Sequence, residues 1–225
     1  MKDTAYLVVH GFGGSLAETN YLVEYLRARG LSVYTPLLPG HGGTKKDLKN
    51  TDYTAWVDHV RATAFTLAEA YRQIVYLGFS MGGLLGTFLT DIPQVQKFVL
   101  INTPIYFWSL NIIAADVFSG LWRRDFEKWR YYRRAVGRIS IKSSFDFLKI
   151  LSLGKKQIAG IERPTLLIQC KRDETAFYRS AQYIRDKIPD FSVLRYYDGG
   201  CHSIFEEASP LREEICFDVY AFLTG

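Results

Sequence analysis

Cysteine and histidine are scarce in this sequence of 225 residues, which contains three cysteines and four histidines. The cysteines, Cys170, Cys201 and Cys216, lack C-x-x-C spacing, and the histidines are widely scattered. These features argue against a disulfide framework and a zinc site, and an odd set of unpaired thiols is typical of a reduced, cytoplasmic protein. We therefore expect a cytoplasmic location, no metal and no other cofactor.

Long apolar runs are also missing. The opening residues, MKDTAYLVVHG, hold only a short apolar stretch with no small-residue cleavage site, which is unlike a signal peptide. The stretch from Ile105 to Trp122 is apolar and aromatic, but it contains Asn111 and Asp116. An aspartate at bilayer depth costs about 2.5–3.5 kcal/mol, so we interpret this stretch as buried or pocket-lining and expect no integral membrane segment.

Charge of one sign is concentrated in a single stretch. The net charge is +5, and the residues from Arg123 to Lys142 carry eight lysines and arginines against Asp125 and Glu127. Because the remainder of the chain is close to neutral, nucleic-acid binding would depend wholly on that stretch, and we do not expect a nucleic-acid partner. The sequence leaves the oligomeric state open.

What the sequence does contain is a regular alternation of strand and helix patterns. Six short segments are apolar almost throughout, as is typical of strands in a parallel sheet covered on both faces. They are Ala5–Val9, Ser32–Thr35, Ile74–Leu77, Lys97–Ile101, Thr165–Gln169 and Ser192–Tyr196. Helical patterns lie between them, at 21–29, around Trp56 to Leu67, after Ser80, at Thr175–Lys187 and at Leu211–Phe222. The alternation predicts an α/β protein with a doubly wound, mostly parallel sheet of about six strands.

One interval breaks this alternation. Some sixty residues separate the strand that ends near Asn102 from the strand that begins near Thr165, whereas a crossover needs about a dozen. We predict a core formed by residues 1–103 and 162–225, with a helical cap inserted at residues 104–161.

The segment Gly78-Phe79-Ser80-Met81-Gly82 matches the pattern G-x-S-x-G and lies between a predicted strand and a predicted helix. Such a sharp turn forces the serine into strained dihedral angles and requires small residues two positions before and after it. It also lifts the hydroxyl above the carboxyl edge of the sheet. An ordinary glycine-rich turn is the alternative, but the context favours Ser80 as a nucleophile.

A serine nucleophile needs a base. Of the four histidines, His202 follows the last predicted strand, at the same edge of the sheet as Ser80. His10 and His41 precede glycines in loops, where they would brace the backbone, and His59 lies among polar neighbours on a helix. We therefore expect His202 to be the base.

The base in turn needs an orienting acid, which should follow a strand between Ser80 and His202. Asp173 follows the strand Thr165–Gln169 and is the preferred candidate, with Asp198 and Glu174 as rivals. The resulting chain order of Ser, Asp and His is the one found in α/β-hydrolases.

An oxyanion site is expected in the loop His10-Gly11-Phe12-Gly13-Gly14, which follows the first strand. If that strand lies beside the one that precedes Ser80, the backbone N–H groups of Phe12 and Met81 can point at one oxygen. A phosphate-binding glycine loop is the alternative, but the segment lacks both G-x-G-x-x-G spacing and a P-loop lysine.

Together the segments HGFGG, PGHGG, GFSMGG, CKRDE and GGCHS resemble the α/β-hydrolase superfamily. More narrowly, the sequence resembles small, thermostable bacterial carboxylesterases, which are close to bacterial monoacylglycerol lipases. The resemblance extends to NTDYTAW and DVYAFL, covers nearly the whole chain and is weakest in the insertion. It implies a catalytic triad of Ser80, Asp173 and His202, with oxyanion donors at Phe12 and Met81. The chain departs from the family in having almost no lead-in before the first strand and an unusually basic, aromatic insertion.

We therefore predict a serine carboxylesterase that hydrolyses small-molecule carboxylic esters with short to medium acyl chains, monoacylglycerols among them. Two alternatives stay open: a thioesterase or acyltransferase that uses the same triad, and a catalytically silent homologue that binds a ligand.

The insertion is expected to set the acyl specificity. Trp122, Phe126, Trp129 and Val136 recur at helical spacing, and with Trp108 and Phe118 they could wall an acyl pocket. The plainer interpretation is that this stripe packs the cap on the core. The basic face of the same helix could contact anionic lipid surfaces or a released carboxylate.

Overall fold

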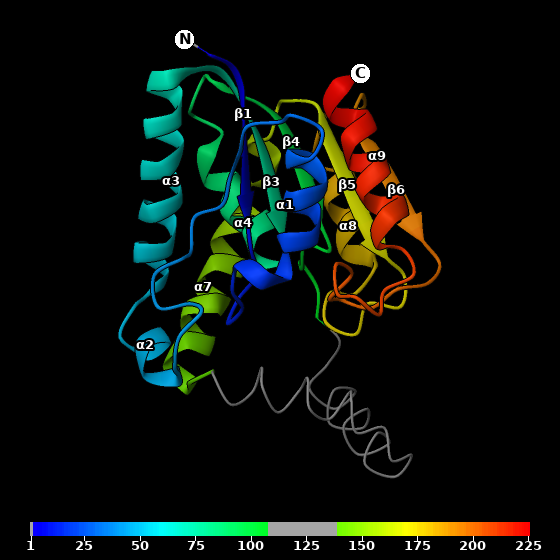
Figure 1. The fold of residues 1–225 in the computed structure, drawn as a ribbon. Coiled ribbons are helices and arrows are strands. Elements are labelled where there is room, and N and C mark those ends of the chain that lie inside the picture. Colours follow the sequence, from blue (N-terminus) through cyan, green and yellow to red (C-terminus); the bar gives the residue numbers. More distant parts are fainter. Residues whose placement is uncertain (1, 108–138) are drawn as a thin grey trace.

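The computed structural model describes residues 2–107 and 139–225, and within them six parallel strands form one sheet in the order β2-β1-β3-β4-β5-β6. The strands are β1 (Lys2–Val9), β2 (Val33–Tyr34), β3 (Tyr71–Phe79), β4 (Val95–Ile101), β5 (Thr165–Cys170) and β6 (Val193–Tyr197). Each corresponds to a strand predicted from the sequence, and the prediction of a doubly wound parallel sheet is confirmed (Figure 1).

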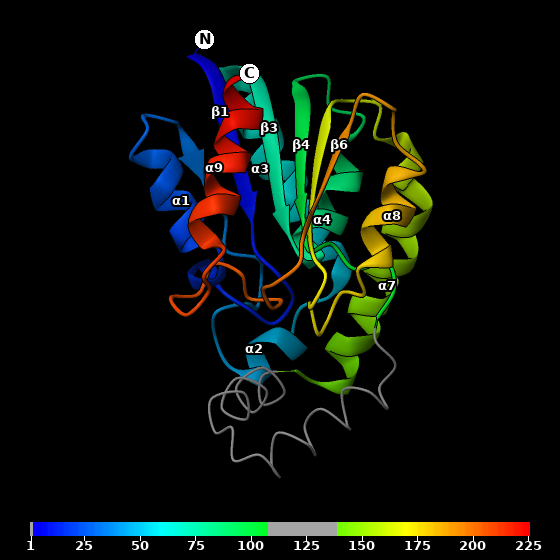
Figure 2. The same ribbon diagram turned by 90° about the vertical axis from the view of Figure 1, so that its right-hand side faces the viewer.

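Helices cover both faces of this sheet. The helices α1 (Asn20–Arg27) and α9 (Arg212–Thr224) lie on one face, and the other carries α3 (Tyr53–Ala70), α4 (Met81–Gly86), α7 (Ile141–Gln157) and α8 (Arg179–Arg185) (Figure 2). The remaining elements are the short helix α2 (Lys45–Lys49) and 3₁₀ turns at Leu16–Glu18, Thr87–Leu89 and Ile158–Gly160.

Strand β1 illustrates why this arrangement buries the chain so well. Successive side chains of a strand point to opposite faces. Leu7 and Val9 accordingly pack into the core beneath α3 and α4, whereas Tyr6 and Val8 pack into the core beneath α1 and α9. A strand covered on both faces must be apolar at every position, which explains its uninterrupted apolar sequence.

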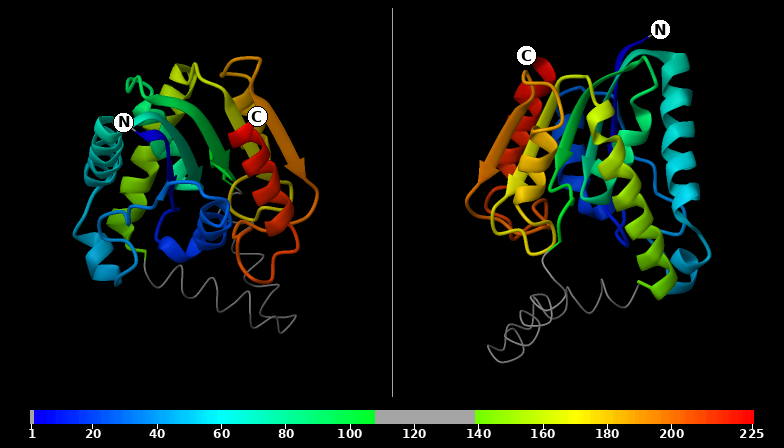
Figure 3. Two further views of the ribbon diagram at one scale, coloured as in Figure 1. Left: turned by 45° about the horizontal axis from the view of Figure 1, so that its top comes forward. Right: turned by 180° about the vertical axis from the view of Figure 1, so that it is seen from behind.

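The carboxyl ends of the strands meet at one edge of the sheet. Val9 is paired with Gly78, and Phe79 is paired with Ile101, so β1, β3 and β4 end at the same level. The loops that follow them gather at this edge, while β1 begins and α9 ends at the opposite edge (Figures 1 and 3). In open α/β sheets, ligands bind at the carboxyl edge.

The helices differ from the predictions in two ways. First, α8 begins at Arg179 rather than Thr175, because the preceding residues pair with another segment: Ala176 forms an isolated antiparallel bridge with Phe107, and the Phe177 N–H donates to the Tyr106 carbonyl. Second, α2 and α7 were not predicted.

Helix α7 falls within the predicted insertion of residues 104–161, yet its Ile150 is fully buried in the core that also contains Leu84 and Leu85 of α4, as is Ile158 in the 3₁₀ turn that follows α7. The C-terminal part of that range therefore packs as a core element. Within residues 2–107 and 139–225, no helix combines the length and the apolar character that a membrane crossing requires.

The packing of α7 leads to a stability prediction. Replacing Ile150 with alanine removes a fully buried side chain and leaves a cavity, so we expect the free energy of unfolding to fall by about 2–5 kcal/mol. Ile141, in the same helix, is 81% exposed, and Ile141→Ala should change it by less than about 0.5 kcal/mol. Urea denaturation measures both. Equal effects of the two substitutions would contradict the buried position of α7.

Candidate active site

Ser80 lies in a strained turn between β3 and α4. Its backbone angles are φ 52° and ψ −122°, a region that non-glycine residues seldom occupy. The Ser80 N–H donates to the Ile101 carbonyl at 2.8 Å, which anchors the turn to the end of β4. Strain of this kind persists only where the surrounding structure enforces it, and it is concentrated at functional sites.

The glycines on either side of Ser80 are required by close backbone contacts. A Cβ on Gly78 would lie 2.5 Å from the carbonyl carbon of Gly82, and a Cβ on Gly82 would lie 2.3 Å from the carbonyl oxygen of Val9. No side chain fits at either position without moving the backbone. The same contacts press the start of α4 against the end of β1.

His202 bridges the serine to an acid. Its Nε2 lies 2.8 Å from Ser80 Oγ, and its Nδ1 lies 2.8 Å from Asp173 Oδ2. Because a carboxylate only accepts hydrogen bonds, the Nδ1–H donates to Asp173, which leaves Nε2 to accept from the Ser80 hydroxyl. The structure thus brings together the three residues that the sequence singled out, all of them more than nine-tenths buried.

The two alternative acids, Asp198 and Glu174, have partners other than the His202 ring. Asp198 is exposed and pairs with Lys171 at 2.6 Å. Glu174 accepts the backbone N–H of His202 at 3.0 Å and therefore holds the histidine loop rather than the imidazole. Asp173 is fixed by the N–H groups of Thr175 and Ala176, each 2.7 Å from its Oδ1.

The electrostatic surroundings favour the protonated form of His202. Burial by itself disfavours the imidazolium, but the carboxylate of Asp173, through its charge and its hydrogen bond, outweighs that effect. Glu174 and Glu18 add further negative charge, and the pKa of His202 is raised above 6.5 as a result. The ring also packs against Phe79, with the ring centroids 5.2 Å apart.

The other histidines have different surroundings. His10 contacts the Gly11 carbonyl through Nδ1 at 2.8 Å and accepts the Leu38 N–H at 3.1 Å, so it braces two loops. His41 contacts the Pro39 carbonyl at 3.1 Å. Burial lowers the pKa of each ring to about 4, so both are neutral at pH 7. His59 lies on α3.

The loop after β1 lies directly against Ser80. A Cβ on Gly11 would be 3.1 Å from Ser80 Cβ and 3.2 Å from the carboxylate of Glu18, which accepts the Gly11 N–H at 3.0 Å. Met81 is the first residue of α4, and N–H groups in the first turn of a helix have no partner within the helix. The expected oxyanion donors, Phe12 and Met81, thus belong to two segments that flank the hydroxyl.

Asn102, which was not identified from the sequence, holds the backbone of the loop that carries His202. It is fully buried in the left-handed region, with φ 46°. Its side-chain nitrogen donates to the His202 carbonyl at 3.2 Å, and its oxygen accepts the Cys170 N–H at 2.9 Å. An asparagine that directly follows a buried strand at the carboxyl edge is the signal that could have identified it.

The predicted acyl-pocket residues, Trp108, Phe118, Trp122, Phe126 and Trp129, lie outside the described residues. The structure does show an aromatic surface beside the Phe12 loop. Phe12 stacks on Phe147 of α7 with centroids 4.8 Å apart, and Phe107 contacts the same Phe147 ring edge-on at 5.4 Å. The described residues include no cluster of His, Cys, Asp and Glu that could hold a metal ion.

Comparison with known proteins agrees with this fold. Residues 6–213 match the alpha/beta hydrolase family, and the chain therefore belongs to it.

Among proteins of known sequence, the chain is 25% identical to a carboxylesterase of Bacillus subtilis, over 98% of this chain and 92% of the relative. It is 32% identical to a thermostable monoacylglycerol lipase of Bacillus sp. strain H-257, over 51% of this chain and 45% of the relative. Among solved structures, one from work on two metagenome-derived lipolytic enzymes, LipS and LipT, superposes with a TM-score of 0.80 at 20% identity, covering 99% of this chain and 94% of that one.

The charges around His202 lead to a titration prediction. We expect its imidazole to titrate above pH 6.5, and Glu174→Gln should lower this pKa because it removes a charge while keeping an acceptor for the His202 N–H. Because the pKa is raised on folding, the imidazolium stabilises the fold below about pH 6.5, and this contribution is lost as the pH rises through the folded pKa.

The measurement is an NMR titration of the histidine rings. Asp198→Asn removes an exposed carboxylate that pairs with Lys171 and should leave the pKa of His202 unchanged. A pKa at or below 6.5 in the unaltered protein, or one that does not respond to Glu174→Gln, would contradict the electrostatic account.

Proposed function

We propose that this protein is a serine esterase that hydrolyses carboxylic esters. The observation that carries the proposal is the continuous chain of hydrogen bonds from Ser80 through His202 to Asp173, with two heavy-atom distances of 2.8 Å. A serine, a histidine and a buried acid in this order form the constellation that activates a hydroxyl for attack on an acyl group.

In the proposed reaction, His202 Nε2 takes the proton as Ser80 Oγ attacks the acyl carbon. Asp173 keeps the ring in the required tautomer and stabilises the imidazolium. The proton then passes to the departing alcohol, which leaves an acyl-enzyme. Water, deprotonated by the same histidine, attacks that intermediate and releases the acid.

The oxyanion of each tetrahedral intermediate would be held by the N–H groups of Phe12 and Met81. Their flanking positions, on the loop after β1 and in the first turn of α4, support this assignment. Fixed donors of this kind need no reorganisation during the reaction, and the loss of one typically costs about 10²–10³ in rate.

The proposed substrates are esters with short to medium acyl chains, and the names of the relatives, a carboxylesterase and a monoacylglycerol lipase, agree with this class. The stacked rings of Phe12 and Phe147 offer an apolar surface next to the proposed oxyanion donor. We further propose that the predicted insertion of residues 104–161, apart from the core-packed helix α7, forms a cap over this site.

The first test is direct. In the unaltered protein, a fluorophosphonate probe should label one residue, Ser80, and p-nitrophenyl butyrate should be hydrolysed. Ser80→Ala should lose both the label and the turnover, because Ser80 supplies the hydroxyl that is hydrogen-bonded to the His202 ring. Labelling is read by mass spectrometry. Undiminished hydrolysis by Ser80→Ala, or a label on another residue, would exclude the proposed mechanism.

A second test concerns the acyl chain. Phe147→Ala removes the ring stacked on Phe12, so kcat/KM for p-nitrophenyl octanoate should fall several-fold while that for the acetate ester changes little, since each buried methylene contributes about 0.8 kcal/mol. Phe145 lies in the same helix but is 65% exposed, and Phe145→Ala is the matched control. Equal losses for both esters in Phe147→Ala would exclude an acyl-binding role for this ring.

A further inference from the structure

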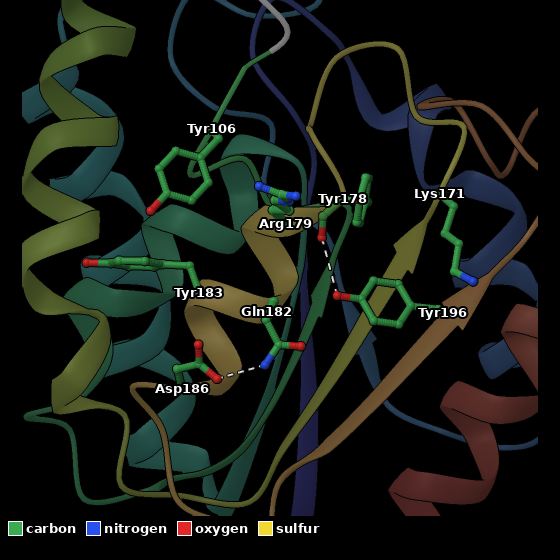
Figure 4. Close-up of a pocket in the computed structure, with 8 residues that line it drawn as sticks. All are labelled: Tyr106, Lys171, Tyr178, Arg179, Gln182, Tyr183, Asp186 and Tyr196. Carbon is green, nitrogen blue, oxygen red and sulfur yellow. Dashed lines mark hydrogen bonds between the residues drawn. The ribbon is translucent and has the colours of Figure 1, made fainter.

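A pocket lies apart from Ser80, over the outer face of α8 (Figure 4). Its volume is about 490 Å³, which falls in the range of small-molecule sites. None of Ser80, Asp173 and His202 lines it.

Tyrosine rings form the walls of this pocket. On one side, Tyr106 and Tyr183 meet edge to face with centroids 5.7 Å apart. On the other side, Tyr178 and Tyr196 meet at 6.5 Å, and the Tyr196 hydroxyl donates to the Tyr178 carbonyl at 3.4 Å. Tyr178 and Tyr183 belong to the segment of α8 itself, whereas Tyr106 and Tyr196 come from other parts of the chain, and the rings surround the face of α8 (Figure 4). Ring faces of this kind stack on planar groups.

The floor of the pocket carries opposite charges at its two ends. Arg179 is the first residue of α8, and no carboxylate among residues 2–107 and 139–225 pairs with it. Asp186 caps the other end of the helix and accepts from Gln182 at 2.7 Å. Seven residues of helix separate the two charges by about 10 Å along the axis.

Positive charge exceeds negative charge around the rings. The ammonium of Lys155 lies 4.5 Å from the ring centre of Tyr106 and 4.8 Å from that of Tyr183. Lys171 lines the pocket at the Tyr196 side, where it pairs with Asp198 at 2.6 Å. Because Lys171 is already paired, an anionic group is favoured near Arg179, while the far end, at Asp186, favours a group that donates hydrogen bonds.

We propose that this pocket binds a nucleoside monophosphate. The base would stack on the face of a tyrosine ring, its amino group would donate toward Asp186, and the phosphate would contact Arg179. Two simpler ligand classes fit the pocket less well. An aromatic acid without an amino group has no hydrogen-bond donor for Asp186, and a sugar phosphate has no aromatic ring to stack on the tyrosines. The proposal is independent of the ester hydrolysis proposed above, since it involves no residue of that site.

The pocket is also linked to the acid of the catalytic site. The Phe177 N–H donates to the Tyr106 carbonyl at 2.9 Å, and the Tyr106 N–H donates to Ser180 Oγ at 2.9 Å. These bonds tie the wall of the pocket to the loop that Asp173 anchors at Thr175 and Ala176.

Isothermal titration calorimetry with AMP, adenosine and ribose 5-phosphate tests the proposal. AMP should bind, and each of the two fragments should bind at least about tenfold more weakly, because stacking on an aromatic ring and a charge-assisted phosphate contact each contribute about a factor of ten or more. No detectable heat with AMP at millimolar concentration would overturn the proposal, and so would adenosine binding as tightly as AMP.

Variants then locate the site. Tyr183→Leu keeps the apolar bulk but removes the ring, and Arg179→Gln removes the charge, so each should weaken AMP binding about tenfold or more. Arg172→Gln alters an exposed arginine that does not line the pocket and should bind AMP normally. Circular dichroism confirms folding of each variant. AMP affinity unchanged in both Tyr183→Leu and Arg179→Gln would overturn the assignment, whatever the esterase assays give.

Discussion

The turn at Ser80 is the constraint on which the rest of the site depends. A backbone with positive φ at a non-glycine residue costs about 1–3 kcal/mol. This cost is offset by the sheet: β3 enters the turn between β1 and β4, and the start of α4 is pressed against the Val9 carbonyl. Gly78 and Gly82 permit this packing because any side chain there would displace backbone atoms. The position of the hydroxyl at the carboxyl edge of the sheet therefore follows from close packing on three sides.

The histidine loop depends on a different set of contacts, which are long-range and polar. Asn102, which follows β4, donates a hydrogen bond to the His202 carbonyl, and Glu174 accepts one from the His202 N–H. Asp173 orients the ring, and its own carboxylate is held by the backbone of the next turn. Two neighbouring strands, β4 and β5, thus deliver the groups that hold His202 and its ring. The concentration of carboxylates around it raises its pKa, which keeps the ring basic in a buried setting.

Several parts of the fold could be predicted because their signals are local. A strand covered on both faces shows an unbroken apolar run, and all six runs became strands. Helix α7 was missed because its buried side chains, such as Ile150, alternate with exposed ones such as Phe145 and Leu148 in a segment expected to be a cap. The late start of α8 was missed for another reason. Its sequence permits helix from Thr175, but Ala176 and Phe177 pair instead with the segment at Tyr106 and Phe107, which is distant in sequence.

The site divides in the same way. The sequence by itself determined the turn at Ser80, because only glycine fits two positions before and after the serine. It also limited the candidates for the base and the acid to residues in loops that follow strands, because parallel strands end at one edge of the sheet. Tertiary structure decided which carboxylate meets His202. Asp173, Glu174 and Asp198 are close in sequence or in space to that loop, yet Asp173 binds the ring, Glu174 the backbone and Asp198 a lysine. It also decided the role of Asn102 and the gathering of four tyrosines over α8. Most of these contacts join residues far apart in the chain, and no local pattern encodes which distant partner a side chain will meet once the sheet has formed.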